Sequence, residues 1–308
     1  MKKVLITGGF GFIGKHLINK LDSLGIEILI LEHPDVLIPE NFNSYELIKA
    51  DLTDQEAIAK LKIKGVDTLI HLAAQSSGPK SFSIPEVDIK LNILGTLNAI
   101  KICENNSIDR ILYASSFVVY GDVINSNHQA IKENTCCNPK SVYANSKLCS
   151  ENLLKVYAEP KGIKWNTIRM FNVYGPGQDI SKPDQGVVGI FLNMLLKEPN
   201  VIVKGSLDRF RDLIYIDDVI EAWTAIIIGT KFNETYNLGT GDKTYYRDLI
   251  DTISKTIGYE DYKVQSDSPT PGDILGCYAD IKKLKEDFGF EPKYTLQKGL
   301  SNMIKSYI

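Results

Sequence analysis

The alternation of short apolar runs with amphipathic helical segments most constrains the fold of this chain. Strand-like runs occupy residues 3–7, 27–32, 45–51, 66–74, 110–115 and 165–171. Helical segments lie between them at 12–25, from Asp54, at 86–105 and from about Ser141. Repeated strand–helix–strand units form right-handed crossovers, which produce a parallel sheet covered by helices on both faces. The sequence therefore predicts an α/β, doubly wound parallel sheet.

The second half of the chain is less regular. Gly- and Pro-rich loops at 174–186 and 266–273 separate helical segments at 187–197, 217–228, 244–257, 280–288 and 296–307, with short strands at 201–203, 212–216 and 234–238. At 308 residues the chain is long enough for two units. We expect residues 1–172 plus about 212–238 to form the larger one. About 173–211 plus 239–308 would form a smaller α/β lobe over the C-terminal edge of the sheet, where such folds bind ligands.

Composition and charge exclude several classes of function. A net charge of −3 argues against general affinity for nucleic acid or an acidic membrane. The five cysteines form no C-x-x-C pair or Cys/His cluster, which argues against a disulfide framework or a metal site. The N-terminus is too short and polar for a signal peptide, and no apolar run approaches about 20 residues. We expect a soluble cytoplasmic protein.

A glycine-rich turn follows the first predicted strand. The segment TGGFGFIG (7–14) places Gly8, Gly11 and Gly14 between strand and helix. Glycines at this spacing allow a tight turn, close approach of the backbone to a pyrophosphate and close helix–strand packing. The helix N-terminus adds free N–H groups that face anionic oxygens. This context favours a dinucleotide site over an ordinary turn.

An acidic residue supports the same interpretation independently. Glu32 ends the second predicted strand, where a carboxylate binds the ribose hydroxyls of adenosine and repels a 2′-phosphate. The sequence therefore favours NAD over NADP. Asp51, after the third strand, is a candidate adenine contact, although aspartate at a strand end is commonly a turn former.

The segment YANSK (143–147) carries the candidate catalytic pair. Tyr143 and Lys147 are four residues apart, so both side chains lie on one helix face. An ammonium beside a phenol stabilises the phenolate, and we expect Lys147 to lower the pKa of Tyr143 toward neutrality. Ser116, at the end of the strand before this helix, would hold a substrate oxygen against Tyr143, whereas Ser115 is expected to serve packing or hydrogen bonding.

The chain resembles the extended short-chain dehydrogenase/reductase family, and within it the nucleotide-sugar epimerases. The matching segments, in order, are TGGFGFIG, DLTD (51–54), HLAA (71–74), NILGT (92–96), YASSFVVYGD (113–122), YANSK, FNVYGPGQ (171–178), RDLIYIDDV (211–219) and PGDILGCYAD (271–280). The resemblance covers nearly the whole chain. It implies a Rossmann-type NAD-binding domain with Ser116, Tyr143 and Lys147 as the catalytic triad, and a cleft for a nucleotide sugar beneath the smaller lobe.

The resemblance also implies further contacts. NAD would be bound by Gly8, Gly11, Phe12, Ile13, Gly14, Glu32, Asp51, Leu52, Leu72, Ala73, Ala74, Asn92, Tyr143 and Lys147. The substrate would be bound by Ser77, Ser116, Asn172, Arg211, Asp273 and Cys277, with Asn172 and Arg211 at the diphosphate. Family members commonly form homodimers through the helices at 86–105 and 141–157, and many serve polysaccharide biosynthesis.

Two apolar residues bear on the type of reaction. The family's 4,6-dehydratases carry Asp and Glu directly after the triad serine or threonine, whereas this chain has Phe117 and Val118, which cannot move a proton. Dehydration is therefore disfavoured. A 4-epimerase that keeps NAD tightly bound and recycles it through a 4-keto sugar is expected. The alternatives are an NAD(P)H-dependent 4-ketoreductase of a 4-keto-6-deoxy sugar nucleotide, against which Glu32 weighs, and a non-catalytic sensor.

Two positions of PGDILGCYAD bear on the substrate. Hexose-specific epimerases carry a bulky Tyr where this chain has Cys277, so the resemblance leaves room for an N-acetyl group and for UDP-N-acetylhexosamine beside UDP-hexose. The alternative is that Cys277 is simply a small buried residue. Thr270 replaces an Arg that the family often uses at the diphosphate, so Arg211 carries more of that contact or Arg209 or Lys204 substitutes. UDP is the expected nucleotide; dTDP, GDP and CDP stay open.

Overall fold

A seven-stranded parallel sheet forms the centre of the molecule. The computed structural model describes residues 3–121, 129–184, 186–269 and 274–308. The sheet has the order β11-β6-β5-β4-β1-β2-β3, and every neighbouring pair is parallel. Its strands are β1 (Lys3–Thr7), β2 (Glu27–Glu32), β3 (Glu46–Lys49), β4 (Thr68–His71), β5 (Arg110–Ser116), β6 (Lys164–Met170) and β11 (Glu234–Leu238). The predicted doubly wound Rossmann-type fold is confirmed.

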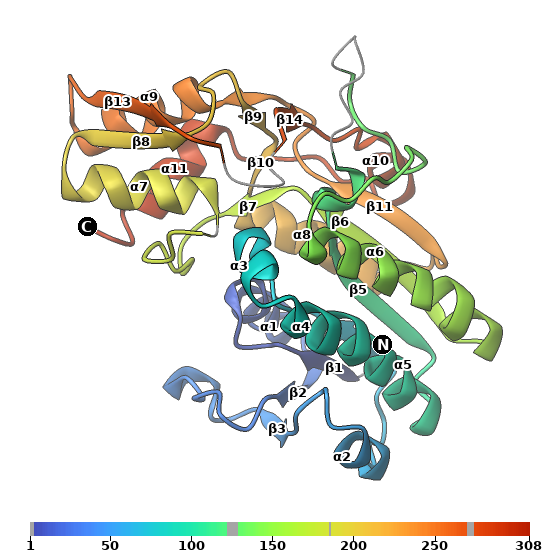
Figure 1. Cartoon of the computed structure of the whole chain (residues 1–308). Helices are drawn as coiled ribbons and strands as arrows, with labels where there is room; N and C mark the ends of the chain where they lie inside the picture. The colour runs from blue at the N-terminus through green and yellow to red at the C-terminus, as the bar shows by residue number, and fades with distance from the viewer. Residues whose placement is uncertain (1–2, 122–128, 185, 270–273) are drawn as a thin grey trace.

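Helices cover both faces of this sheet (Figure 1). On one face α1 (Phe12–Ser23) and α8 (Ile216–Ile228) lie side by side. The other face carries α2 (Gln55–Lys60), α5 (Gly95–Asn105) and α6 (Val142–Leu153). The strands divide their side chains accordingly: Val4 and Ile6 pack with α1 and α8, whereas Leu5 packs with α2 and α5. Successive strand residues point to opposite faces, so each strand contributes to both layers of the core.

The predicted helix at 86–105 is not a uniform α-helix. It consists of α4 (Pro85–Val87), a π-helical segment (Asp88–Leu94) and α5. The predicted helix at 141–157 likewise continues from α6 into a π-helical segment (Leu154–Ala158), and the other predicted helices and strands are present with small differences at their ends. For example, α9 (Tyr246–Ile257) follows the short strand β12 (Thr244–Tyr245) rather than starting at 244. Such shifts of one or two residues are usual at helix ends.

Three smaller sheets lie above the main sheet in Figure 1. They pair β7 (Asn172–Tyr174) with β10 (Leu213–Tyr215), β8 (Asn200–Lys204) with β13 (Lys263–Asp267), and β9 (Phe210–Arg211) with both β12 and β14 (Gly276–Cys277). The helices that pack against them are α7 (Val187–Lys197), α9 and α11 (Leu296–Ile304). The short helix α3 (Gly78–Ser83) packs against α6, and α10 (Lys282–Phe288) packs against β11. The exact division into two units stays a prediction.

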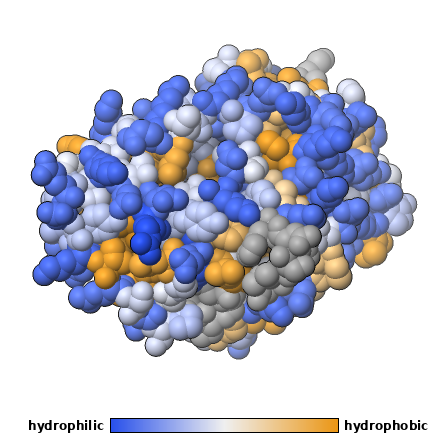
Figure 2. Space-filling model, turned by 90° about the horizontal axis from the view of Figure 1, so that it is seen from above, coloured by the Kyte–Doolittle hydropathy of each residue, from blue (hydrophilic) through white to orange (hydrophobic). Residues whose placement is uncertain are grey.

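The surface is of mixed character. Seen from above, hydrophobic patches are scattered among hydrophilic side chains (Figure 2). Within the described ranges, every helix is too short or too polar to cross a bilayer.

Candidate active site

The glycine-rich turn lies where the strand order reverses, between β1 and β4. Gly8 has a φ of +71°, and a Cβ there would lie 2.7 Å from the Cα and N of Ala73. A Cβ on Gly14 would lie 2.4 Å from the carbonyl oxygen of Gly9, so α1 packs directly on the turn. Gly11 is the N-cap of α1 and provides no side-chain cap, and the first turn contains no acidic residue. The start of α1 therefore suits an anionic group such as a pyrophosphate.

A cavity of about 400 Å³ extends from this turn toward the end of β2. It is lined by Gly8, Phe10, Gly11, Leu31, Glu32, His33, Val36, Ala50, Asp51, Leu52, Leu72, Ala73, Ala74 and Leu91. The Glu32 carboxylate accepts hydrogen bonds from the backbone N–H groups of Phe10 (3.2 Å) and His33 (3.4 Å). Burial raises the pKa of Glu32 against these bonds. The apolar wall with one acidic edge fits the adenosine half of NAD.

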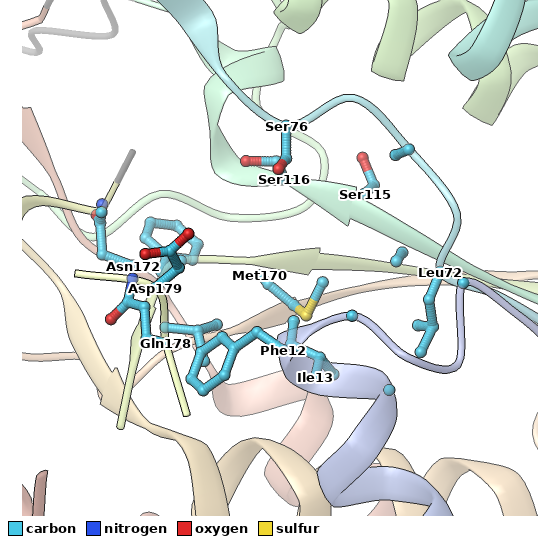
Figure 3. Close-up of a pocket in the computed structure, with 18 of the residues that line it drawn as sticks. Phe12, Ile13, Leu72, Ser76, Ser115, Ser116, Met170, Asn172, Gln178 and Asp179 are labelled. Atoms are coloured by element: carbon cyan, nitrogen blue, oxygen red, sulfur yellow. The ribbon is translucent and has the colours of Figure 1, made fainter. Parts of the chain in front are cut away.

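A second cavity, of about 560 Å³, brings the predicted catalytic residues together. Ser116, Tyr143 and Lys147 line it, and so do Gly8, Gly11, Phe12, Ile13, Gly14, Leu72, Ala74, Asn172 and Gln178, among others. Figure 3 shows Phe12 and Ile13 at the start of α1 near Met170, with Asn172, Gln178 and Asp179 grouped at one end. The two cavities share Gly8, Phe10, Gly11, Leu72 and Ala74, so together they form a channel of suitable shape for a dinucleotide.

Tyr143 is held between α6 and the end of β5. Ser141 caps α6 by accepting a hydrogen bond from the backbone N–H of Ala144 at 3.1 Å, which fixes the helix start beside Tyr143. Ser116 lies close enough to the Tyr143 hydroxyl to lower its pKa. Lys147 donates to the carbonyl oxygen of Ala114 at 2.8 Å and lies 6.0 Å from the centre of the Tyr143 ring.

The protonation of this pair differs from the sequence-based expectation. Burial raises the pKa of Tyr143 to about 12, against the lowering effect of the Ser116 hydrogen bond. Burial also lowers the pKa of Lys147 to about 7, although Asp88 and Glu151 oppose this. The expectation that Lys147 lowers the pKa of Tyr143 is wrong for the protein residues alone, because the loss of water outweighs a nearby ammonium that is itself only partly charged.

Ser115, directly before Ser116, belongs to a separate buried network. Its hydroxyl donates to Glu151 at 2.5 Å, and Glu151 also accepts hydrogen bonds from Arg169 at 2.6–3.2 Å. Glu151 and Arg169 are almost inaccessible to water. Arg169 in addition stacks its guanidinium over the ring of Tyr120 at 4.7 Å. The network ties α6 to β5 and β6, so the predicted structural use of Ser115 is confirmed.

Asn92 lies in a second buried network, behind the cavities. Its side-chain amide bonds both backbone groups of Gln75 and contacts Asp88 (3.1 Å) and Ser146 (2.9 Å). These bonds hold the loop after β4 against α6. Asn92 is absent from the described lining of both cavities, although the sequence analysis expected it to contact NAD. It lies behind the cavity walls and supports them.

His71 is a buried core residue. Its ring nitrogens are hydrogen-bonded to the hydroxyls of Thr7 (2.7 Å) and Thr96 (3.1 Å). Burial, with a smaller contribution from Lys147, lowers the pKa of His71 to about 3. His71 therefore stays neutral at ordinary pH and ties β4 to β1 and α5.

A third cavity, of about 520 Å³, lies between α3, α7 and the sheet of β9. Arg209, Arg211 and Lys204 line it together with Tyr246. Both guanidinium groups lie over the ring of Tyr246, at 4.8 Å for Arg209 and 5.4 Å for Arg211. Arg211 also donates to the carbonyl oxygens of Phe210, Ile274 and Leu275. Paired arginines held by an aromatic ring suit a diphosphate.

The remaining predicted substrate residues occupy different places. The buried Oδ1 of Asn172 has no hydrogen-bond partner among the described residues, and Asn172 lines the catalytic cavity. Ser77 donates to the carboxylate of Asp184 at 2.6 Å and caps α3. Cys277 is 4 % exposed and belongs to the apolar cluster of Phe117 instead of to the described lining of the cavities. Asp273 and Thr270 lie outside the described residues.

Several wall residues were not predicted as parts of the site. Phe117 and Val187 each line both the catalytic and the arginine-lined cavity. Phe171 stacks on Phe117, with ring centroids 5.3 Å apart. The sequence analysis considered Phe117 only as an apolar residue that cannot transfer a proton, although its position directly after Ser116 indicates a place in the cavity wall. No sequence pattern indicates such a place for Val187. In the described part of the chain, no group of three or more His, Cys, Asp or Glu side chains is arranged to hold a metal ion.

Comparison with known proteins places this geometry in context. Residues 4–239 match the model of the NAD dependent epimerase/dehydratase family. The chain is 35 % identical to a putative UDP-glucose 4-epimerase of Methanocaldococcus jannaschii over 98 % of its own length and 97 % of the relative's. It is 30 % identical to a dTDP-4-dehydro-6-deoxyglucose reductase of Escherichia coli, over 98 % and 96 %.

Two solved structures cover the whole fold. The UDP-glucose 4-epimerase of Thermotoga maritima with UDP-glucose aligns with a TM-score of 0.92 at 30 % identity, over 99 % of this chain and 98 % of that one. The UDP-N-acetylglucosamine 4-epimerase of Methanobrevibacter ruminantium M1, in complex with UDP-N-acetylmuramic acid, aligns with a TM-score of 0.89 at 30 % identity over the same shares.

Proposed function

Because the chain belongs to the NAD-dependent epimerase/dehydratase family, we propose that it is a 4-epimerase of a nucleotide sugar, acting on UDP-hexose, UDP-N-acetylhexosamine or both. The cofactor is NAD. The observation that carries the proposal is the wall of the catalytic cavity, where Ser116, Tyr143 and Lys147 stand beside Phe117. These residues can move a proton at one sugar hydroxyl beside the cofactor. At the two positions where a dehydratase carries carboxylates, this chain has Phe117 and Val118.

Each member of the triad has a defined task. Ser116 would orient the 4-hydroxyl of the sugar, and Tyr143 as phenolate would remove its proton. Bound NAD would supply the acceptor and later the donor of the C4 hydride and, when oxidised, a positive charge that favours the phenolate. The 4-keto sugar would turn over in the cavity, and Tyr143 would return the proton to its oxygen. Lys147 assists through its charge.

The cofactor undergoes no net change in this cycle, so we propose that it stays tightly bound. Glu32, held by two backbone N–H groups, would accept hydrogen bonds from the adenosine ribose.

We assign the nucleotide end of the substrate to the arginine-lined cavity. Arg209 and Arg211 are both more than nine-tenths buried. Burial lowers the pKa of Arg209, and the nearby charge of Arg211 adds to this lowering. A diphosphate between the two guanidinium groups would offset the repulsion between their charges. We therefore propose that Arg209 replaces the arginine that the family often has at the position of Thr270. UDP is the proposed nucleotide, in keeping with the UDP-sugar relatives.

The proposal also covers the type of sugar, the cellular location and the oligomeric state. Cys277 packs in the buried cluster of Phe117, and we propose that its small side chain, where hexose-specific relatives have Tyr, is what allows an N-acetyl group in the neighbouring cavity. We propose that the protein is a cytoplasmic homodimer. Ile89 (54 % exposed) and Val156 (70 % exposed) supply apolar surface on the helical segments at 86–105 and 141–157, through which family members commonly pair.

A 4-ketoreductase is the second candidate, favoured by the E. coli reductase relative. Such an enzyme would consume reduced cofactor, usually NADPH. The buried carboxylate of Glu32 argues against a 2′-phosphate in the adenosine cavity.

One experiment separates the candidates. Purified protein is incubated with UDP-glucose or UDP-N-acetylglucosamine without added cofactor, and the sugar nucleotides are separated by chromatography. The epimerase produces the 4-epimer of at least one of them until equilibrium is reached. Absence of both epimers, together with oxidation of NADPH or NADH on a 4-keto-6-deoxy sugar nucleotide, would show that the chain is a reductase.

A further inference from the structure

Two side chains form the junction between the catalytic cavity and the arginine-lined cavity. Phe117 and Val187 are the only described residues that line both. Phe117 is 8 % exposed, and its ring stacks on Phe171 at 5.3 Å with an angle of 21° between the planes. Val187 is the first residue of α7 and faces the junction from the opposite unit. The connection between the two cavities is therefore apolar on both sides.

The proposed function places the sugar ring at this junction. The diphosphate on C1 lies with Arg209 and Arg211 in one cavity, whereas C4 must reach Ser116 and Tyr143 in the other. Since Phe117 lines both cavities, a sugar that reaches from one cavity into the other passes along its side chain. When the 4-keto sugar turns over, each edge of the sugar ring in turn faces Phe117 and Val187.

Such a wall is unfavourable for a charged sugar. Moving a carboxylate from water against apolar side chains is costly unless a cation compensates it. Two cations of the catalytic cavity have other partners: Lys147 donates to the carbonyl oxygen of Ala114, and Lys182 lies 3.8 Å from the Asp179 carboxylate. The other lysines of the two linings are Lys15, in α1 beside the glycine-rich turn, and Lys140 and Lys204, which line the arginine-lined cavity. Asp179 in the catalytic cavity and Asp184 in the arginine-lined cavity would also repel an anionic sugar.

We propose that the junction of Phe117 and Val187 is a charge filter, which admits nucleotide sugars with an uncharged hexose and rejects uronates. This inference rests on the proposed function and narrows its substrate class. It makes Phe117 a specificity-determining residue.

The first test compares substrates on the unchanged protein. The expected kcat/KM for UDP-glucuronate is at least about 30-fold below that for the better of UDP-glucose and UDP-N-acetylglucosamine, in line with the cost of burying an unpaired polar or charged group. A smaller ratio overturns the filter and leaves the epimerase proposal standing. Absence of turnover with all three contradicts the proposed function instead.

A binding measurement decides the filter even without turnover. Isothermal titration of the same protein should give tighter binding of UDP-glucose than of UDP-glucuronate. Equal affinities would overturn the inference, and failure of both to bind would overturn the proposed function together with the filter that rests on it.

Variants locate the filter. Phe117→Ser replaces the ring by a hydroxyl and should raise the glucuronate-to-glucose ratio of kcat/KM at least about tenfold, because the site then offers a hydrogen bond and room for water. The matched control Phe117→Leu stays apolar and should keep the ratio within about threefold. Val187→Thr conserves shape and should raise the ratio about threefold, which tests the junction even if Phe117→Ser does not fold. An unchanged ratio in both polar variants would contradict the assignment.

Discussion

The two adjacent serines at the end of β5 occupy contrasting environments. Ser115 is 2 % exposed and donates to Glu151, which in turn is bound by Arg169. Ser116 is partly exposed, lines the catalytic cavity (Figure 3) and lies close enough to Tyr143 to lower its pKa. Both hydroxyls belong to polar networks that end on α6. One network holds the helix in place with its charges paired, and the other presents groups to the cavity.

The two networks therefore contribute to different properties, one to the stability of the fold and the other to catalysis. Paired and fully hydrogen-bonded buried charges contribute to the stability of one arrangement, and breaking one partner is strongly destabilising. Groups in a reaction cavity keep unused hydrogen-bonding capacity for the substrate. Substitutions in the first network should therefore change mainly stability, and substitutions in the second mainly turnover.

Tyr143→Phe should have the largest effect on turnover. It removes the proton acceptor and donor while keeping the ring, so kcat should fall at least about 10³-fold. The free energy of unfolding should change by less than about 1 kcal/mol. Epimerisation assays and urea unfolding measure the two quantities. An active variant would show that another group moves the proton.

Glu151→Ala should have the largest effect on stability. It leaves the Arg169 guanidinium buried without its carboxylate, at an expected cost of about 3–5 kcal/mol in the free energy of unfolding. The matched control is Glu221→Ala, which removes the exposed ion pair with Lys20 and should cost less than about 1 kcal/mol. Similar losses in both variants, measured by urea unfolding, would contradict the contrast between buried and exposed pairs.

Exchanging each serine for alanine compares the two networks directly. Ser116→Ala should lower kcat/KM about 10–100-fold with little change in stability, because a hydroxyl that binds the reacting oxygen is lost. Ser115→Ala should cost about 1–3 kcal/mol of stability by removing a donor from Glu151, with a smaller effect on kcat/KM. If Ser115→Ala impaired turnover more than Ser116→Ala, the assignment of the two roles would be reversed.

The pH dependence of stability tests the burial of His71. His71 has a pKa of about 3 in the folded chain, so between the unfolded value of 6.5 and 3 only the unfolded chain binds this proton. Stability therefore falls as the pH falls through this range, by up to about 1.4 kcal/mol per pH unit. His71→Gln should flatten the pH dependence of urea-unfolding stability between pH 6.5 and 4.5. Parallel curves for His71→Gln and the wild type would contradict this.

Local signals made much of the fold predictable. The first strand, the glycine-rich turn and Glu32 follow from short stretches whose residue types have direct backbone or charge consequences. The π-helical segment at Asp88–Leu94 was not predicted, because its apolar spacing is also that of an ordinary helix. Its geometry is stabilised by contacts of Asn92 with Gln75 and Ser146, which are 17 and 54 residues away along the chain.

The site was predictable where one segment supplies the chemistry. Tyr143 and Lys147 share a helix face, so their meeting follows from spacing alone. The apolar junction does not, because Phe117 and Val187 come from distant segments and meet only in the folded chain. The same holds for Ser77 and Asp184, whose hydrogen bond no local pattern indicates. The pKa of Tyr143 was misjudged because burial depends on the whole cavity.

The position of β11 and α8 has a consequence for synthesis on the ribosome. The sheet needs β11 (Glu234–Leu238) beside β6 (Lys164–Met170), and α1 needs α8 (Ile216–Ile228) to cover Leu17, Ile18 and Leu21. Roughly 70 residues separate the end of β6 from the end of β11, which takes about 3–14 s to translate. During this interval the nascent chain exposes one edge of its sheet and the apolar side of α1. A chaperone that binds extended apolar segments would meet the nascent chain in that interval.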